Sequence, residues 1–316
     1  MLIQNWPALT LTLILMSTSF GGCLGDRIIP NNENSMSISV PIWTKGLFWD
    51  YSVKTQEIET STTMIVAEDS NSTDYSVGTA SLMDAKQHAV LNHNPAIGRV
   101  KMSDLSIYEN GINQVILDFP LEKNKAWSFS LYGKDNFAAS VLDITPNLVT
   151  ITAINSDGSK IEYKFDKEVK WLRSFVYTNA NDVTVLNMQL ANHGDDYSGN
   201  SYFCRGGDLY DEEFIGPDFG FYDTEFANEG HERYGDWDYI VYYLEAEIGG
   251  SGSGELILRD HESTELLVET FSPGNSKNEL GTVTGNSGNW TLEISLSGDA
   301  DVRIRIAGAK EYLYAL

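Results

Sequence analysis

The residues best suited to chemistry lie in one acidic and aromatic stretch, residues 206 to 243. Calcium prefers six to eight oxygen ligands, and protein loops often gather the carboxylates and carbonyls that supply them. The stretch lacks the D-x-[DN]-x-[DN]-G order of an EF-hand, so any calcium site would be built differently. We name as candidate calcium ligands Asp208, Asp211, Glu212, Asp218, Asp223, Asp236 and Asp238.

The same stretch holds aromatic side chains that could stack on a sugar or contact a peptide. The alternative is that these aromatic rings belong to the core of a β domain, beside a solvated acidic face. Both interpretations stay open at the level of sequence. The candidate ligand surface is Tyr210, Phe219, Tyr222, Tyr234 and Trp237.

Motifs for catalysis are absent from the sequence: it contains no HExxH, no GxSxG, no P-loop and no GxGxxG. His88 and His93 lie close to Asp84 and are the histidines best placed to share a site. We therefore favour a binding or structural role. The alternative is a surface hydrolase that uses His88 and His93 or carboxylates of the segment 208–238.

The position of one cysteine indicates where the protein is located. The apolar run from Trp6 to Phe20 is shorter than the roughly 20 residues that span a bilayer, and it suits the core of a secretory signal. Gly21, Gly22 and Cys23 follow it. This arrangement resembles the lipobox of bacterial and archaeal lipoproteins, in which a peptidase cuts before a cysteine that carries lipid.

The resemblance implies a signal peptide over 1–22, lipid on Cys23 and a polar tether over 23–35. It implies an exported protein held on the outer face of the cell membrane or envelope, with the membrane as partner through the anchor. An ordinary cleaved signal and a retained membrane helix are the alternatives. With Cys23 lipidated, Cys204 has no internal disulfide partner, and we expect it to be buried and inert. Two sequons, at Asn71 and Asn289, permit N-glycosylation of an exported chain.

The net charge of −24 over 316 residues excludes one class of partner. Nucleic acid binding requires clustered Lys and Arg to contact phosphates, and this chain has 45 acids against 21 bases. A glycan or protein partner remains compatible with the composition. A solvated acidic coat is the simplest interpretation of the charge.

Alternating hydrophobic residues predict an all-β protein. In the segment 148–165, apolar residues alternate with polar ones along two arms, and Gly158 lies in the turn between them. The apolar residues are Val149, Ile151 and Ala153 in the first arm and Ile161, Tyr163 and Phe165 in the second. The segment 171–194 repeats this design. One helix is predicted, over 81–91. We predict two antiparallel domains: a barrel-like or meander domain over 36–192, and a β-sandwich over 196–316.

Two segments resemble known kinds of β domain. The run GNWTLEISLSGDADVRIRI, residues 288 to 306, is similar to the closing hairpin of jelly-roll domains appended to secreted proteins. The spacing of the strand-like segments LDFPLEKNKAW, KWLRSFVY and MQLANHG resembles that in uncharacterised lipid-anchored, barrel-like domains of bacteria and archaea. Neither resemblance implies an activity.

Overall fold

The computed structural model describes residues 36–68, 73–92, 94–216, 221–230 and 235–316. Strands make up 63% of the described residues and helix 4%, so the predicted all-β class is confirmed. Met36–Leu316 forms one compact unit. No helix within the described ranges is both long and apolar enough to cross a membrane.

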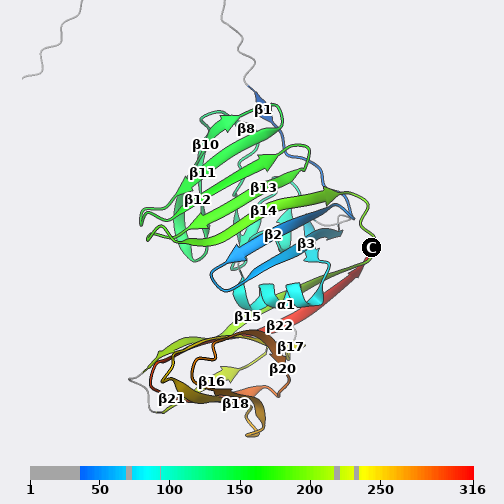
Figure 1. Cartoon of the computed structure of the whole chain (residues 1–316). Coiled ribbons are helices and arrows are strands. Elements are labelled where there is room, and N and C mark those ends of the chain that lie inside the picture. Colours follow the sequence, from blue (N-terminus) through cyan, green and yellow to red (C-terminus); the bar gives the residue numbers. More distant parts are fainter. Residues whose placement is uncertain (1–35, 69–72, 93, 217–220, 231–234) are drawn as a thin grey trace, which may run out of the picture. The chain divides into compact units, whose positions relative to one another are not determined.

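The N-terminal strands form an antiparallel meander that belongs to a sheet of 16 strands (Figure 1). The path of this sheet has two free ends, so the meander alternative holds and the barrel-like alternative is wrong. In sheet order its N-terminal members are β4 (Asp74–Thr79), β3 (Glu59–Glu68), β2 (Phe48–Thr55), β14 (Thr184–Gly194), β13 (Trp171–Thr178), β12 (Lys160–Asp166), β11 (Leu148–Ile154), β10 (Lys134–Ile144) and β9 (Ala126–Leu131).

Short strands complete this region. Three of them extend from β4: β5 (Gly98–Lys101), β6 (Ile107–Glu109) and β7 (Ile112–Gln114). The other two pair only with each other: β1 (Ser37–Ile38) and β8 (Leu121–Glu122).

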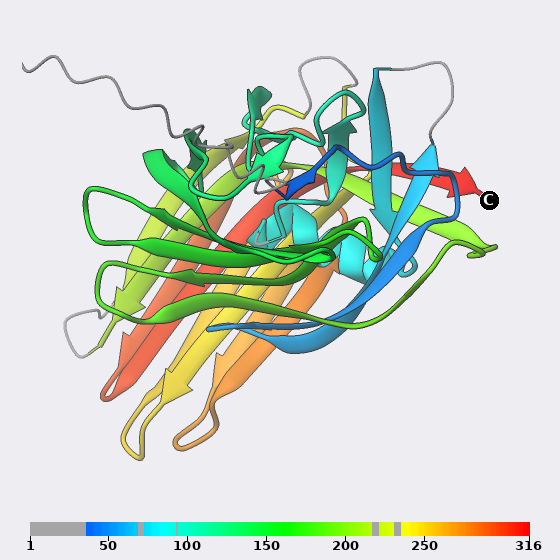
Figure 2. The same ribbon diagram turned by 90° about the horizontal axis from the view of Figure 1, so that it is seen from above.

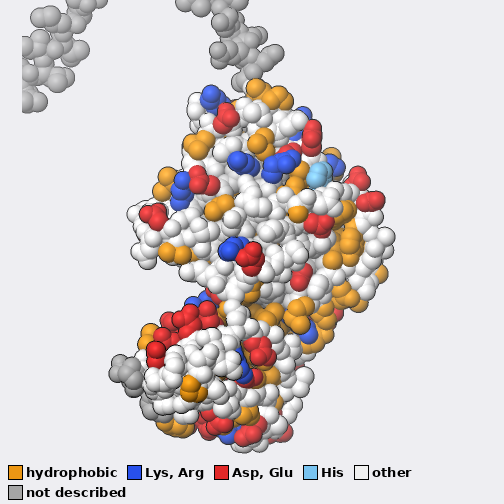
Figure 3. Space-filling view, in the orientation of Figure 1, with side chains coloured by type: hydrophobic (Ala, Val, Ile, Leu, Met, Phe, Trp, Pro, Cys, Tyr) orange, Lys and Arg blue, Asp and Glu red, His pale blue; other side chains and the backbone are white. Residues whose placement is uncertain are grey.

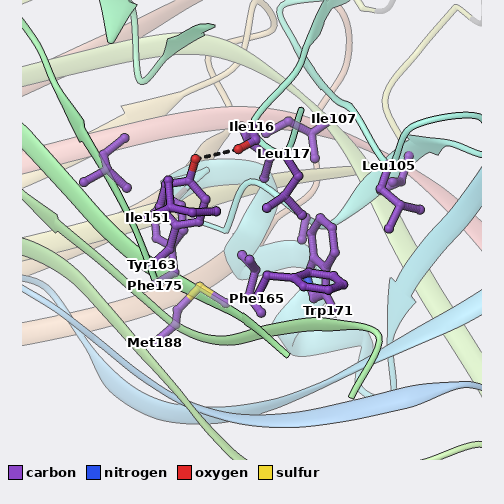
Figure 4. Packing of buried hydrophobic residues seen from close by; sticks show 14 of the residues in the cluster. Leu105, Ile107, Ile116, Leu117, Ile151, Tyr163, Phe165, Trp171, Phe175 and Met188 are labelled. Carbon is purple, nitrogen blue, oxygen red and sulfur yellow. Dashed lines mark hydrogen bonds between the residues drawn. The ribbon is translucent and has the colours of Figure 1, made fainter. Parts of the chain in front are cut away.

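The two predicted hairpins are present, because strict alternation puts every second side chain on the buried face. In the β11–β12 pair, Val149 lies opposite Phe165 and Ile151 opposite Tyr163, and all four side chains are buried. The β13–β14 pair contributes Phe175 to the same core. Figure 4 shows this core, in which the Tyr163 hydroxyl donates a hydrogen bond to the Ile116 carbonyl.

The C-terminal region is a sandwich of two antiparallel sheets, as predicted. One layer continues the large sheet through β15 (Asn200–Ile215), β22 (Ala300–Ala315), β17 (Tyr239–Ile248) and β20 (Lys277–Val283). The other is a separate sheet ordered β16 (Tyr222–Asn228), β21 (Gly288–Ser297), β18 (Ser253–Arg259) and β19 (Glu265–Phe271). Apolar side chains of both layers, among them Leu244, Ile304, Leu292 and Leu256, form one core.

The resemblance of residues 288–306 to a closing hairpin is not borne out. β21 and β22 follow each other in sequence but lie in different sheets, and they are not hydrogen-bonded to each other. Both strands alternate because each buries one face in the same sandwich core from opposite sides. The alternation therefore predicted the strands β21 and β22 correctly but predicted their pairing incorrectly.

The predicted helix is α1 (Leu82–Leu91), which lies against β15, β22 and β17 on the face opposite the sandwich core (Figure 2). The Ser81 hydroxyl accepts hydrogen bonds from the backbone N–H groups of Met83 and Asp84 and so caps the helix N-terminus. Asn92 ends the helix with a left-handed backbone, and its N–H donates to the His88 carbonyl. The division into two domains at residues 193–195 stays a prediction.

Candidate functional site

The site begins where α1 packs against two long strands. A side chain at Gly206 in β15 would overlap the Ala89 carbonyl oxygen of the helix. On the opposite face, Trp237 packs against Gly207 and against Gly308 of β22, and a side chain at either glycine would overlap its indole ring. The glycines therefore allow a helix and a tryptophan to contact the same pair of strands from both sides.

A cavity of about 440 Å³ opens where α1 ends. We call it the helix-end cavity. A bulge in the β15–β22 ladder at Leu209 lies beside it and interrupts the regular pairing. The cavity is lined by the last turn of α1 and by two strands: Val90, Leu91, Asn92, Asp208, Leu209, Tyr210, Asp211, Arg305 and Ile306.

A group of charged residues borders this cavity. Arg303 contacts Asp211 with two parallel hydrogen bonds of 3.1 Å, and Arg305 lies 3.3 Å from the same carboxylate. Arg305 also pairs at 3.2 Å with Glu57, whose side chain is only 9% exposed. Glu57 belongs to the turn between β2 and β3, so the pair ties the meander to the sandwich.

That turn is held by neutral groups as well. Asn278 donates a hydrogen bond of 2.7 Å to the Glu57 carbonyl, and the Tyr243 hydroxyl donates to the same oxygen at 3.4 Å. Burial, together with the nearby carboxylates of Glu245 and Glu57, raises the pKa of Tyr243 to about 12. Tyr243 therefore stays protonated and remains a donor at neutral pH.

The remainder of this face is acidic. Residues opposite each other in an antiparallel ladder share a face, which places Glu213 and Glu245 beside Arg303, and Glu247 beside Asp301. Burial, and then the like charges of Glu57 and Glu247, raise the pKa of Glu245, although Arg303 and Arg305 oppose the shift. Figure 3 shows acidic side chains gathered in a hollow beside the sandwich layer.

The candidate calcium ligands are distributed over several elements. Asp208 and Asp211 line the helix-end cavity, Glu212 lies opposite Ile304, and Asp223 is on β16 in the other sheet. Asp236 accepts a hydrogen bond from Ser287, and Asp238 pairs with Lys310 at 2.7 Å. Within the described residues, no group of three or more His, Cys, Asp or Glu could hold a metal ion.

Asp238 shows how such carboxylates are already engaged. Burial would raise its pKa, but hydrogen bonds from the Lys310 ammonium and the Glu311 backbone N–H lower it below its usual value. The calcium site itself stays a prediction, and Asp218 lies outside the described residues.

The candidate ligand-surface aromatics contact the core instead of forming an open platform. Tyr210 and Phe226 have ring centroids 5.1 Å apart, and Tyr222 lies 5.1 Å from the buried Phe214. Tyr210, Tyr222 and Trp237 all pack against the sandwich cluster. This arrangement corresponds to the core alternative, because half-buried rings gain more from apolar contact than from exposure. Phe219 and Tyr234 lie outside the described residues.

Of the two histidines of the hydrolase alternative, His88 lies on α1, as does the neighbouring Asp84. Asp84 and His88 are four residues apart on α1 and border a second cavity of about 40 Å³, with Thr62 on its other side. Burial raises the pKa of Asp84, although hydrogen bonds from Thr62 and Ser81 oppose the shift. His93 lies outside the described residues.

Cys204 is a free, buried cysteine against α1. Burial raises the pKa of its thiol to about 12, with the nearby Glu311 carboxylate adding to the shift. The thiolate is therefore scarce at neutral pH, as expected for an inert cysteine. Asn289 is exposed on β21, which keeps its sequon accessible, whereas Cys23 and Asn71 lie outside the described residues.

Sequence reasoning missed Glu57, Arg303 and Arg305. The signal for the two arginines was present: basic residues are scarce, yet the strand "VRIRIAGA" places two of them on the polar face of an alternating run. Nothing local marks Glu57, because its role depends on a turn that meets a strand some 250 residues away in sequence.

No protein-family model matches the sequence, and no curated protein matches it. Among solved structures, similarity extends to an exo-β-1,3-galactanase from Phanerochaete chrysosporium, with 7% identity over 78% of each chain and a TM-score of 0.19. A glycoside hydrolase family 43 arabinoxylan arabinofuranohydrolase from Bacillus subtilis matches 82% of this chain and 66% of its own, with 10% identity and a TM-score of 0.18. Infectious bursal disease virus matches with 8% identity over 87% of this chain and 54% of its own, at a TM-score of 0.17. Scores this low support no conclusion about fold or activity.

Proposed function

We propose that this protein is exported, lipid-anchored through Cys23 on the outer face of the cell membrane or envelope, and serves in binding. The apolar run that ends in Gly21, Gly22 and Cys23 supports the anchor. The tether over 23–35 would separate the anchor from the folded part. The acidic surface would keep that part soluble and away from anionic lipid.

The observation that carries the binding role is the helix-end cavity. Ligand sites in proteins are concave, occupy about 300 to 1,000 Å³ and combine apolar walls with a few polar groups. The cavity has a volume of about 440 Å³ and both kinds of lining. This site, on the outer side of the sandwich layer, replaces the stretch of aromatic residues as the best candidate for contact with a ligand.

The hydrolase alternative has weaker support. Asp84 and His88 border a cavity of about 40 Å³, roughly the space of one water molecule and too small for a substrate. In the larger cavity, Asp211 is already engaged by two arginines, which leaves its carboxylate less available to a substrate.

Metabolic labelling with a fatty-acid analogue tests the anchor. We expect the wild type and Cys204→Ala to be labelled and Cys23→Ala to be unlabelled. Because Cys204→Ala removes the only other thiol, it is the matched control. Equal labelling of wild type and Cys23→Ala would contradict the anchor.

A glycan and peptide array, with a panel of hydrolase substrates beside it, tests the binding role on the full-length protein. The proposal predicts no turnover on the panel. Turnover that is abolished by Asp211→Asn or by Asp84→Asn would show an enzyme and would contradict the proposal.

A further inference from the structure

We propose that the helix-end cavity binds a small organic ammonium ion that carries a short apolar chain. The inference rests on the binding role proposed above and names the class of ligand. Four features of the cavity support it: the apolar side chains of its walls, the end of the helix, the carboxylate of Asp208 and the ion pairs of Arg305.

The walls favour an apolar chain. Val90 and Leu91 from α1 and Leu209 from the bulge line the cavity, and Ile306 of β22 lies beside them with its side chain buried in the sandwich core. Burial of methylene groups against such side chains is favourable because it removes apolar surface from water. A short alkyl chain would therefore bind more favourably than a fully hydrated ion.

The helix end favours a positive charge. Val90 and Leu91 are the last two residues of α1, and Asn92 is the cap residue that follows them. The final carbonyls of a helix lack partners within it and together carry about half a negative charge. The cavity is therefore bordered by the negative pole of the helix.

Asp208 supplies a full negative charge beside that pole. It lies opposite Ala307 in the ladder and is exposed at the cavity. Among the described residues, its carboxylate has no ion-pair or hydrogen-bond partner, in contrast to Asp211. An ammonium group has three N–H donors, which the Asp208 carboxylate and backbone carbonyls of the helix end would accept.

The arginine in the lining does not reverse this preference. Arg305 is engaged by Glu57 and Asp211, and Arg303 is engaged by Asp211. Further along the same face, Glu213, Glu245 and Glu247 add negative charge. The raised pKa of Glu245 reflects burial first and then this crowding of like charges. An anion would meet unfavourable potential, and a cation would be attracted.

An organic cation fits better than a metal ion. Calcium requires six to eight oxygen ligands, and the described residues contain no cluster of three or more acidic, histidine or cysteine side chains that could hold a metal. An ammonium ion needs fewer acceptors and gains from the apolar walls, which a metal ion cannot use.

Isothermal titration calorimetry with four probes tests the inference on the full-length protein. The probes are hexylammonium chloride, 1-hexanol, sodium hexanoate and calcium chloride. Hexylammonium, hexanol and hexanoate each contain six carbon atoms and differ in charge. We expect saturable binding of hexylammonium only. Asp208→Asn should weaken it about tenfold, the value of one hydrogen bond to a charged group. The control Glu255→Gln removes an exposed charge from the other sheet and should bind as the wild type does.

Three results would overturn the inference. Equal binding of hexanol and hexylammonium would show an apolar cavity without charge selection. Calcium binding lost in Asp208→Asn would show a metal site. The wild type and Asp208→Asn should both melt cooperatively, which shows that they are folded. If neither then binds hexylammonium, the cavity takes no such cation. The array and the lipid labelling report on the proposed function separately, so either proposal can fail alone.

Discussion

Two halves of one sheet face have opposite chemistry. Beneath α1, the face formed by β15, β17 and β22 consists of small or uncharged residues: Cys204, Gly206, Val241, Ala307 and Ala309. Beyond the helix end, the same strands carry charged residues: Asp211, Arg303, Arg305, Glu245 and Glu247. In β22 the change occurs between Arg305 and Ala307, over a single step of the strand's alternation.

The difference shows what each half must accommodate. A helix backbone can approach a sheet closely only over residues with little or no side chain. An uncovered face must remain solvated, and its charges must be paired where they are partly buried. The cavity lies at the border of the two halves, where α1 ends and the charged residues begin.

Removal of Arg305 should have the largest effect on this arrangement. In Arg305→Met, the Glu57 side chain, which is only 9% exposed, loses its 3.2 Å ion pair with the guanidinium group. Breaking a buried pair by removing one member costs about 3 to 5 kcal/mol, and partial exposure of Arg305 reduces this to about 2 to 3 kcal/mol. Urea unfolding at neutral pH measures the loss.

Lys54→Met is the matched control for that change. Lys54 pairs with Glu59 at 2.8 Å, but both side chains are more than 60% exposed. We expect a much smaller loss of stability than in Arg305→Met, because water and salt screen a fully exposed pair. The double variant Glu57→Gln, Arg305→Met should recover part of the stability, because it removes the buried carboxylate together with the guanidinium group that faces it. Equal losses in the two single variants would contradict the importance of the Glu57–Arg305 pair.

Gly206→Ala tests the covered half. The new methyl group would overlap the Ala89 carbonyl oxygen, so α1 must shift away from β15. Overpacking of this kind costs about 1 to 3 kcal/mol. Gly250→Ala serves as control, since a side chain there meets nothing within 4 Å and should change stability by less than about 0.5 kcal/mol. Thermal unfolding compares the two variants, and a Gly206→Ala midpoint equal to that of Gly250→Ala would show that α1 does not lie as closely as described.

Glu245→Gln probes the open half and should have the smallest effect. The pKa of Glu245 is raised in the folded state, so its ionised form is unfavourable there. The variant should therefore be more stable than the wild type at neutral pH, by less than about 0.5 kcal/mol. The difference should disappear as the pH falls through the raised folded pKa towards the ordinary value. Urea unfolding at about pH 7 and pH 4 measures it, and a variant less stable at pH 7 would contradict the acidic character of this face.

The strands were predictable from sequence, and the contacts between distant strands were not. Alternation in 148–165 gave the β11–β12 pairing because a short turn fixes the register of neighbours. Alternation in 288–306 predicted two strands but not the sheet to which each belongs. Both strands alternate because each buries one face in the same core. The helix was found from composition, and Ser81 and Asn92 confirm its ends.

The candidate site was predictable only in part. Asp208 and Asp211 were named from the acidic run, and both line the cavity. Glu57, Arg305 and the last turn of α1 join them from distant segments of the sequence. The aromatic residues were ambiguous because the same rings suit a ligand surface and a core, and only the packing of Tyr210 and Tyr222 distinguishes the two.

The most direct test of the open half as a binding site is an NMR titration of the isotope-labelled protein with hexylammonium chloride. Our account predicts that the shifted backbone amides cluster around the helix-end cavity, at Leu91, Asn92, Leu209 and Arg305. It also predicts that the amides of β16, β21, β18 and β19 stay unchanged, because that sheet lies across the sandwich core. Shifts spread evenly over the acidic surface, or centred on that second sheet, would contradict the account.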